Sequence, residues 1–143
     1  MNRTILPALV GAALLSAAAA AFAAPPKTGF VREHALAMVE GALTPDQVTQ
    51  LQLIAYQAAI ADVCEGFDID GDKFAAAFET LAPVDAAKMS DAQKDYHDKH
   101  LLVIFGVLVG GELGGISEDP AGACAQAAKD QADAELAPAL VWQ

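Results

Sequence analysis

The chain contains two cysteines, Cys64 and Cys124, and whether they pair decides which distant segments of the fold must lie together. Two cysteines allow one intramolecular disulfide, and such a bond persists where an exported protein folds. The loop that it closes has about 60 residues, which corresponds to about 4 kcal/mol in the chain-entropy model. A reactive or metal-bound pair is the alternative, but the sequence has no CxxC motif and no histidine beside either cysteine. We therefore expect a disulfide between Cys64 and Cys124.

Residues 1–23 have the organisation of a cleaved signal peptide. Arg3 supplies a positive charge, residues 5–21 are uncharged and mostly apolar, and Ala23 ends a small-x-small cleavage motif. The competing interpretation is an uncleaved membrane anchor, because the apolar stretch approaches the length that a bilayer requires. No cysteine follows the stretch directly, so we do not expect a lipoprotein anchor. We expect cleavage after Ala23, a periplasmic or secreted protein, and a single helical domain over residues 24–143.

The chain is acidic, with 19 Asp and Glu residues against 8 Lys and Arg and a formal net charge of −11. Removal of Arg3 with the signal peptide makes the mature chain one unit more negative. A field of this sign repels nucleic acid and anionic lipid surfaces. It is compatible with cationic partners, with divalent metal ions, or simply with solubility. We therefore expect no nucleic-acid partner, and a protein partner stays open.

Helical periodicity runs through almost all of the mature chain, with Pro and Gly at the segment boundaries. Thr44 and Ser90 each precede a glutamine by three residues, as in a capping box, and Asp70 and Asp119 are further candidate N-caps. The predicted fold is all-α, a single-domain bundle of four or five helices with one disulfide. The expected helices cover residues 30–42, 45–65, 71–81 and 120–136, with a fourth helix that begins after Ser90. Glycines at residues 110–111 and 114–115 are expected to weaken the end of this fourth helix.

The expected core combines one face of the second helix with an apolar run in the fourth. On the second helix, apolar residues recur at spacings of three and four: Leu53, Tyr56, Ile60, Val63 and Phe67. Residues 101–109 are free of polar side chains and predict a central buried helix, in an apolar run of about eleven residues that is too short to span a bilayer. Gly106 and Gly110 would let another backbone approach closely. We expect no membrane span in the mature chain.

Four carboxylates follow the spacing of a calcium loop: Asp68, Asp70, Asp72 and Glu79 occupy positions one, three, five and twelve. Over these twelve residues the sequence resembles the EF-hand family, and the stretch lies between two predicted helices. The resemblance implies calcium as a ligand. The chain departs from the family at position six, where Lys73 replaces glycine. The alternative is that Asp70 and Asp72 simply begin the next helix, where the helix dipole favours negative charge.

His97 and His100 lie three residues apart on the fourth predicted helix, where they could hold a soft divalent metal together with a carboxylate. The metalloprotease motif HExxH is absent, and Lys94 and Lys99 oppose a cation. The alternative is a solvated first turn of mixed charge. Glu112 is a further candidate, because it interrupts an apolar helix, although a position at the helix end would let it reach water.

The sequence contains no nucleophile elbow, phosphate-binding glycine loop, convincing catalytic triad or cofactor motif. We therefore expect a non-catalytic binding or interaction protein of the bacterial cell envelope, not an enzyme, with no cofactor unless calcium binds. One alternative is a calcium-binding module through residues 68–79. Another is an acid-stress chaperone, which has the same small, helical, exported build. The last is an enzyme or small-ligand carrier with a site between helices near Glu112 or His100.

Overall fold

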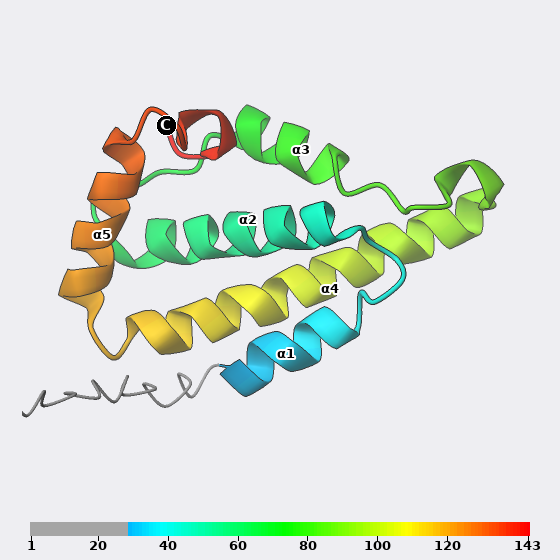
Figure 1. Cartoon of the computed structure of the whole chain (residues 1–143), viewed down its shortest axis with the longest axis horizontal. Helices are drawn as coiled ribbons and strands as arrows, with labels where there is room; N and C mark the ends of the chain where they lie inside the picture. The colour runs from blue at the N-terminus through cyan, green and yellow to red at the C-terminus, as the bar shows by residue number, and fades with distance from the viewer. Residues whose placement is uncertain (1–28) are drawn as a thin grey trace, which may run out of the picture.

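The computed structural model describes residues 29–143, and the predicted signal peptide with its cleavage site lies outside these residues (Figure 1). The described part is all-α, as predicted, with two short 3₁₀ turns and one isolated β-bridge besides its α-helices. The helices are α1 (Gly29–Ala37), α2 (Pro45–Val63), α3 (Gly71–Glu79), α4 (Asp91–Ile116) and α5 (Pro120–Ala132). The 3₁₀ turns are η1 (Ala86–Lys88) and η2 (Ala137–Ala139).

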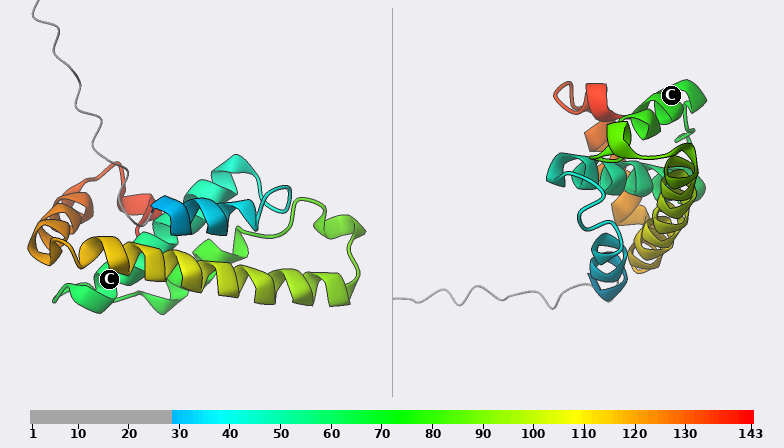
Figure 2. Two further views of the ribbon diagram at one scale, coloured as in Figure 1. Left: turned by 90° about the horizontal axis from the view of Figure 1, so that it is seen from below. Right: turned by 90° about the vertical axis from the view of Figure 1, so that its right-hand side faces the viewer.

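Helices α2 and α4 form the centre of the bundle and run side by side along its long axis (Figure 1). Helix α1 packs on α4, α3 packs on α2, and α5 crosses one end of the bundle, where it contacts α2. The first turns of α4 extend beyond the N-terminal end of α2 and are accompanied by the loop that follows α3 (Figure 2). This end of α4 is therefore only partly covered by the other helices.

The predicted N-caps begin four of the helices. Thr44 and Ser90 form complete capping boxes with Gln47 and Gln93, in which side chain and backbone bond reciprocally. Asp70 accepts hydrogen bonds from the backbone N–H groups of Asp72 and Lys73, so α3 begins directly after it. Asp119 likewise accepts a bond from the N–H of Gly122 at the start of α5. These caps satisfy N–H groups that have no partner inside the helix.

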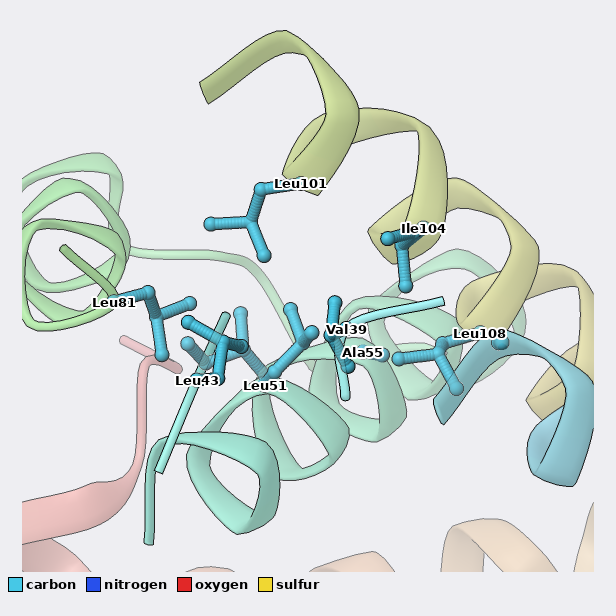
Figure 3. Close-up of a cluster of buried hydrophobic side chains, with 10 residues drawn as sticks. Val39, Leu43, Leu51, Ala55, Leu81, Leu101, Ile104 and Leu108 are labelled. Carbon is cyan, nitrogen blue, oxygen red and sulfur yellow. The ribbon is translucent and has the colours of Figure 1, made fainter. Parts of the chain in front are cut away.

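One core cluster lies between α2 and α4 (Figure 3). Its labelled members come from both helices and from the loops beside them: Val39, Leu43, Leu51, Ala55, Leu81, Leu101, Ile104 and Leu108. Helix α3 is attached by Phe74 and Phe78, whose rings lie 5.7 and 5.2 Å from the ring of Phe105 on α4. Edge-to-face contacts of this kind add to the stabilisation that comes from buried apolar area.

A second cluster lies where α5 crosses the bundle. The disulfide between Cys64 and Cys124 links the end of α2 to the first turns of α5, with the two Cα atoms 5.5 Å apart, as predicted. Trp142 belongs to this cluster and is only 2% exposed, with its ring 4.8 Å from that of Phe67. The C-terminus therefore docks on the bundle, and Ile69 pairs with Trp142 in the isolated β-bridge.

Two expected helix ends are wrong. Helix α1 ends at Ala37 rather than at residue 42, because the chain turns through Gly41, which has a φ of 77°. This turn carries Val39 and Leu43 into the core. Helix α5 ends at Ala132, and the chain then turns towards η2 instead of continuing as a helix to residue 136.

The fourth helix differs most from expectation. The glycines expected to weaken its end do not interrupt it, and α4 continues to Ile116. The expectation of a central buried helix is right for its central position, but only one face of α4 is buried in the core. The glycine of α4 that lies against another helix is Gly111, where a Cβ would lie 3.4 Å from the side chain of Val31 of α1. A Cβ at Gly106 or Gly110 would meet no atom of the described chain within 4 Å.

Candidate functional site

The outer face of α4 exposes large apolar side chains that a folded protein ordinarily covers. Leu102 is 56% exposed and Val103 is 59% exposed, while Leu101 before them and Ile104 after them are buried. One turn further along, Gly106 and Gly110 are exposed too. We call Leu102, Val103, Gly106 and Gly110 the outer face of α4. Because Gly106 follows Leu102 and Val103 by four and three positions, and Gly110 follows Gly106 by four, these residues form one continuous strip on the helix.

An open groove of ≈ 570 Å³ adjoins this outer face, between α3, the loop after it and α4. Leu81 and Leu101 lie in the groove, and Leu102 belongs both to the groove and to the outer face. Charged side chains of α3 and α4 line it as well: Glu79, Lys94 and Asp98. The apolar surface of α4 therefore continues into a hollow with charged side chains around it, which is a typical arrangement for a binding surface.

Among residues 29–143, α4 is long enough and apolar enough to cross a membrane. Of its most apolar stretch, 22% is buried inside the protein. Core helices of water-soluble proteins satisfy the same criterion. Its first nine residues include five charged side chains: Asp91, Lys94, Asp95, Asp98 and Lys99. Charged side chains inside a bilayer are costly.

Glu112 lies inside α4 rather than at its end, and its side chain is 17% exposed. It forms an ion pair and a hydrogen bond with Arg32 of α1, which is half exposed. Together with the contact between Val31 and Gly111, this pair fixes α1 on α4. Glu112 is thus accounted for by a structural contact between two helices.

Tyr56 and Asp130 connect α2 to α5 through a hydrogen bond of 3.4 Å from the phenol to the carboxylate. Burial raises the pKa of Tyr56 to about 12, and the negative charge and hydrogen bond of Asp130 act in the same direction. Glu112 adds a smaller effect of the same sign, which places the phenol within reach of both carboxylates. Tyr56 is therefore neutral over the physiological range, and it acts as a hydrogen-bond donor.

The structure does not gather the four predicted calcium ligands into a loop. Asp70 is the N-cap of α3, and Glu79 is its last residue, so about 13 Å of helix separates them at 1.5 Å per residue. The backbone of Asp68 and Asp70 is bonded to the C-terminal residues: Gln143 donates to Asp68, and Asp70 donates to Val141. No group of three or more His, Cys, Asp or Glu among residues 29–143 is placed to hold a metal ion. Calcium binding stays a prediction, which calorimetric titration with calcium can decide.

His97 and His100 lie on one flank of α4, but they differ in burial. His97 is 8% exposed, and its Nε2 lies 3.1 Å from the backbone oxygen of Leu81, so the expectation of a solvated first turn is wrong for this residue. His100 is partly exposed and stacks on Tyr96, with 5.5 Å between the ring centres. Both histidines line a hollow of ≈ 400 Å³ beside the start of α4.

Sequence reasoning missed Gln57, which is bonded to the C-terminal tail, residues 139–143. Its fully buried side chain accepts a bond from the N–H of Val141 and donates one to the oxygen of Ala139. Its backbone oxygen accepts a bond from the indole N–H of Trp142. A glutamine within an alanine-rich helix gave no periodic signal. Its only mark in the sequence is its polarity between Tyr56 and Ala58.

Comparisons of the chain with protein-family models, with curated proteins and with solved structures find no match. The surfaces described above therefore carry the functional argument by themselves.

Proposed function

We infer that this protein is a non-catalytic, exported binding protein that contacts a protein partner through the outer face of α4. The observation that carries the proposal is the exposure of Leu102 and Val103 beside the bare backbone of Gly106 and Gly110. Removal of apolar surface from water is favourable by about 25 cal/mol per Å², so such a strip favours a partner that covers it. Glycines beside it would let a partner helix approach closely.

The groove and the charge of the chain support the same proposal. The groove continues the apolar strip under α3, and Glu79 and Asp98 line it from opposite helices. A chain with a net charge of −11 attracts basic partners over long distances. The uncharged part of α4 that precedes Glu112 covers residues 101–111, which is about half of the ~20 residues that a spanning helix needs. These features favour a protein partner over a membrane.

An exported location is part of the proposal. The disulfide between Cys64 and Cys124 is compatible with an oxidising compartment. The residues 1–23 have the composition of a signal peptide. We therefore place the mature chain in the periplasm or outside the cell, where it acts by binding.

Two matched substitutions test the proposal. Val103→Lys places a charge on the outer face of α4, whereas Val63→Lys places one on a comparably exposed valine at the end of α2. The full chain would be cross-linked in its native envelope under non-reducing conditions, and circular dichroism would establish that both variants fold. We expect Val103→Lys to lose a cross-linked species that the wild type and Val63→Lys retain. An identical cross-linking pattern for all three proteins would refute the proposed surface.

An acid-stress chaperone is the second candidate, and the same exposed strip favours it. Such a protein would expose more apolar surface to solvent, or change its oligomeric state, when its carboxylates lose their charge in acid. Sedimentation and binding of an apolar dye, followed from neutral to strongly acidic pH, distinguish the two roles. A monomer whose dye binding does not change in acid would remove the chaperone role and leave the partner-binding proposal intact.

A further inference from the structure

An open apolar hollow of ≈ 640 Å³ lies where α1, the turn after it and the start of α2 meet. Val39 and Leu43 of its lining are core residues (Figure 3). Leu36 and Val48 pack against the same core cluster, but part of each residue stays accessible. The rest of the lining consists of small or acidic residues: Glu33, Ala37, Glu40, Gly41 and Pro45. Because the hollow shares no residue with the outer face of α4 or its groove, it is a separate candidate site.

The two charged residues that line the hollow are both acidic, Glu33 and Glu40. Both are exposed, and neither side chain forms a hydrogen bond or an ion pair within residues 29–143. The one Lys or Arg between residues 29 and 48 is Arg32, which is bonded to Glu112 of α4. The hollow is therefore apolar and negatively charged, and the cation of the same segment is engaged elsewhere.

The two carboxylates act on a ligand through their charge rather than as ligands of a metal ion. No group of three or more His, Cys, Asp or Glu in the described part of the chain is placed to hold a metal. A charge near the surface acts over about 8–10 Å at physiological salt, so the carboxylates need not converge on one point. An apolar hollow with such charges complements a molecule that is both apolar and positive.

The size of the hollow favours a small molecule over a protein. Small-molecule sites have volumes of about 300–1,000 Å³, and this hollow falls within that range. A stable protein interface covers about 800 Å² on each partner. Among residues 33–48, however, Met38 is the one large apolar side chain that is exposed, at 38%. The accessible apolar surface is thus concentrated in the hollow and does not spread over a wider patch.

We propose that this hollow binds a small cationic amphiphile, an aliphatic chain that carries an ammonium group. The chain contacts Leu36 and Val48, and each CH₂ group that leaves water completely strengthens binding by about fourfold. The ammonium group stays at the boundary with water, within reach of Glu33 and Glu40. An exposed ion pair there strengthens binding by up to about fivefold. The same charges repel a fatty-acid carboxylate and do not act on a neutral alcohol.

Octylammonium is the probe, and octan-1-ol and octanoate are the neutral and anionic molecules of the same chain length. Each would be titrated into the mature chain at low salt, while the methyl signals of Leu36 and Val48 are followed by NMR. We expect saturable shifts with octylammonium, which should bind up to about fivefold more tightly than octan-1-ol. Octanoate should bind more weakly than both. Hexylammonium should bind up to about fifteenfold more weakly than octylammonium, because it lacks two CH₂ groups.

Two variants separate the contribution of charge from that of the apolar lining. The double variant Glu33→Gln, Glu40→Gln should bind octylammonium no more tightly than octan-1-ol. Val48→Thr keeps the approximate size of the side chain but makes it polar, so it should weaken the binding of both molecules. Circular dichroism would establish that both variants fold.

The matched controls lie near the other end of α2, where Val63 and Glu65 are exposed. Val63→Thr and Glu65→Gln should bind all the probes as the wild type does. The proposal is overturned if octylammonium does not shift the methyl signals, if octanoate binds as tightly as octylammonium, or if the double variant keeps the preference for octylammonium. A loss of binding in the control variants would overturn it as well. None of these outcomes affects the proposed partner surface on α4.

Discussion

Trp142 donates a hydrogen bond of 3.0 Å from its indole N–H to the backbone oxygen of Gln57, so the C-terminal tail is anchored to the middle of α2. The side chain of Gln57 completes the anchor through Val141 and Ala139, at 2.6 and 3.1 Å. Lys73 adds a bond of 2.7 Å to the carbonyl of Trp142. The tail therefore joins α2 to α3, and it closes the apolar cluster beside the disulfide.

Replacement of Gln57 by Leu should release this tail. The substitution keeps the approximate volume but leaves the N–H of Val141 and the oxygen of Ala139 without their partner, which costs about 2–4 kcal/mol in the free energy of unfolding. Trp142 is the single tryptophan, so its fluorescence reports the release directly. We expect a lower urea midpoint and easier quenching of the tryptophan. Gln126→Leu, at an exposed glutamine of α5 whose side chain bonds Asp130 of the same helix, is the control and should leave both measurements nearly unchanged.

The disulfide should contribute strongly to stability. It closes a loop of about 60 residues, and the chain-entropy model gives about 4 kcal/mol for a loop of this length. We expect the double variant Cys64→Ala, Cys124→Ala to lose an amount of this order in urea unfolding. Treatment of the wild type with a reductant should produce the same loss, and it should have no effect on the variant. Two alkylatable thiols in protein purified without reductant would contradict the redox argument.

The capped helix starts and the disulfide could be predicted because each depends on local chemistry or on a single possible pairing. A capping box needs only the residues at the N-cap and three positions later, and Thr44 and Ser90 show it in the sequence. The pairing of Cys64 with Cys124 had no competitor. The all-α class followed from the helical periodicity that runs through almost all of the mature chain.

The buried face of α2 could not be read from the sequence, because both faces of that helix carry apolar residues. Leu53 and Val63 satisfy the expected spacing, yet Leu53 is half-buried and Val63 is 41% exposed. Leu51 and Ile54 belong to the cluster with α4 instead. Gln57 is buried against the C-terminal residues Ala139 and Val141. Tertiary contacts decide between two apolar faces, and these contacts join residues distant in sequence. The same reasoning explains why the exposed side of α4 was predicted as buried.

The ion pair between Arg32 and Glu112 should contribute modestly, because Arg32 is half exposed. A double-mutant cycle with Arg32→Met and Glu112→Gln should give a coupling energy of about 0.5–1 kcal/mol. The coupling should shrink as salt is added, since exposed charges are screened over about 10 Å at ~0.1 M salt. A coupling that stays the same in high salt would indicate that the contact acts through packing of α1 on α4 rather than through charge.

The raised pKa of Tyr56 should make stability fall in alkaline solution. The phenol of the unfolded chain loses its proton near pH 10, whereas that of the folded protein keeps it until about pH 12. Below pH ~10 the stabilisation of the neutral phenol is fully present, and it is lost as the pH rises towards about 12, because only the unfolded chain ionises in this window. We expect Tyr56→Phe to flatten this decline in the free energy of unfolding. The effect should be no more than about 2 kcal/mol, since part of the side chain is in contact with water. Tyr96→Phe, at the exposed tyrosine of α4, is the matched control. If Tyr56→Phe loses stability with pH as steeply as Tyr96→Phe does, the contact between Tyr56 and Asp130 does not govern the alkaline transition.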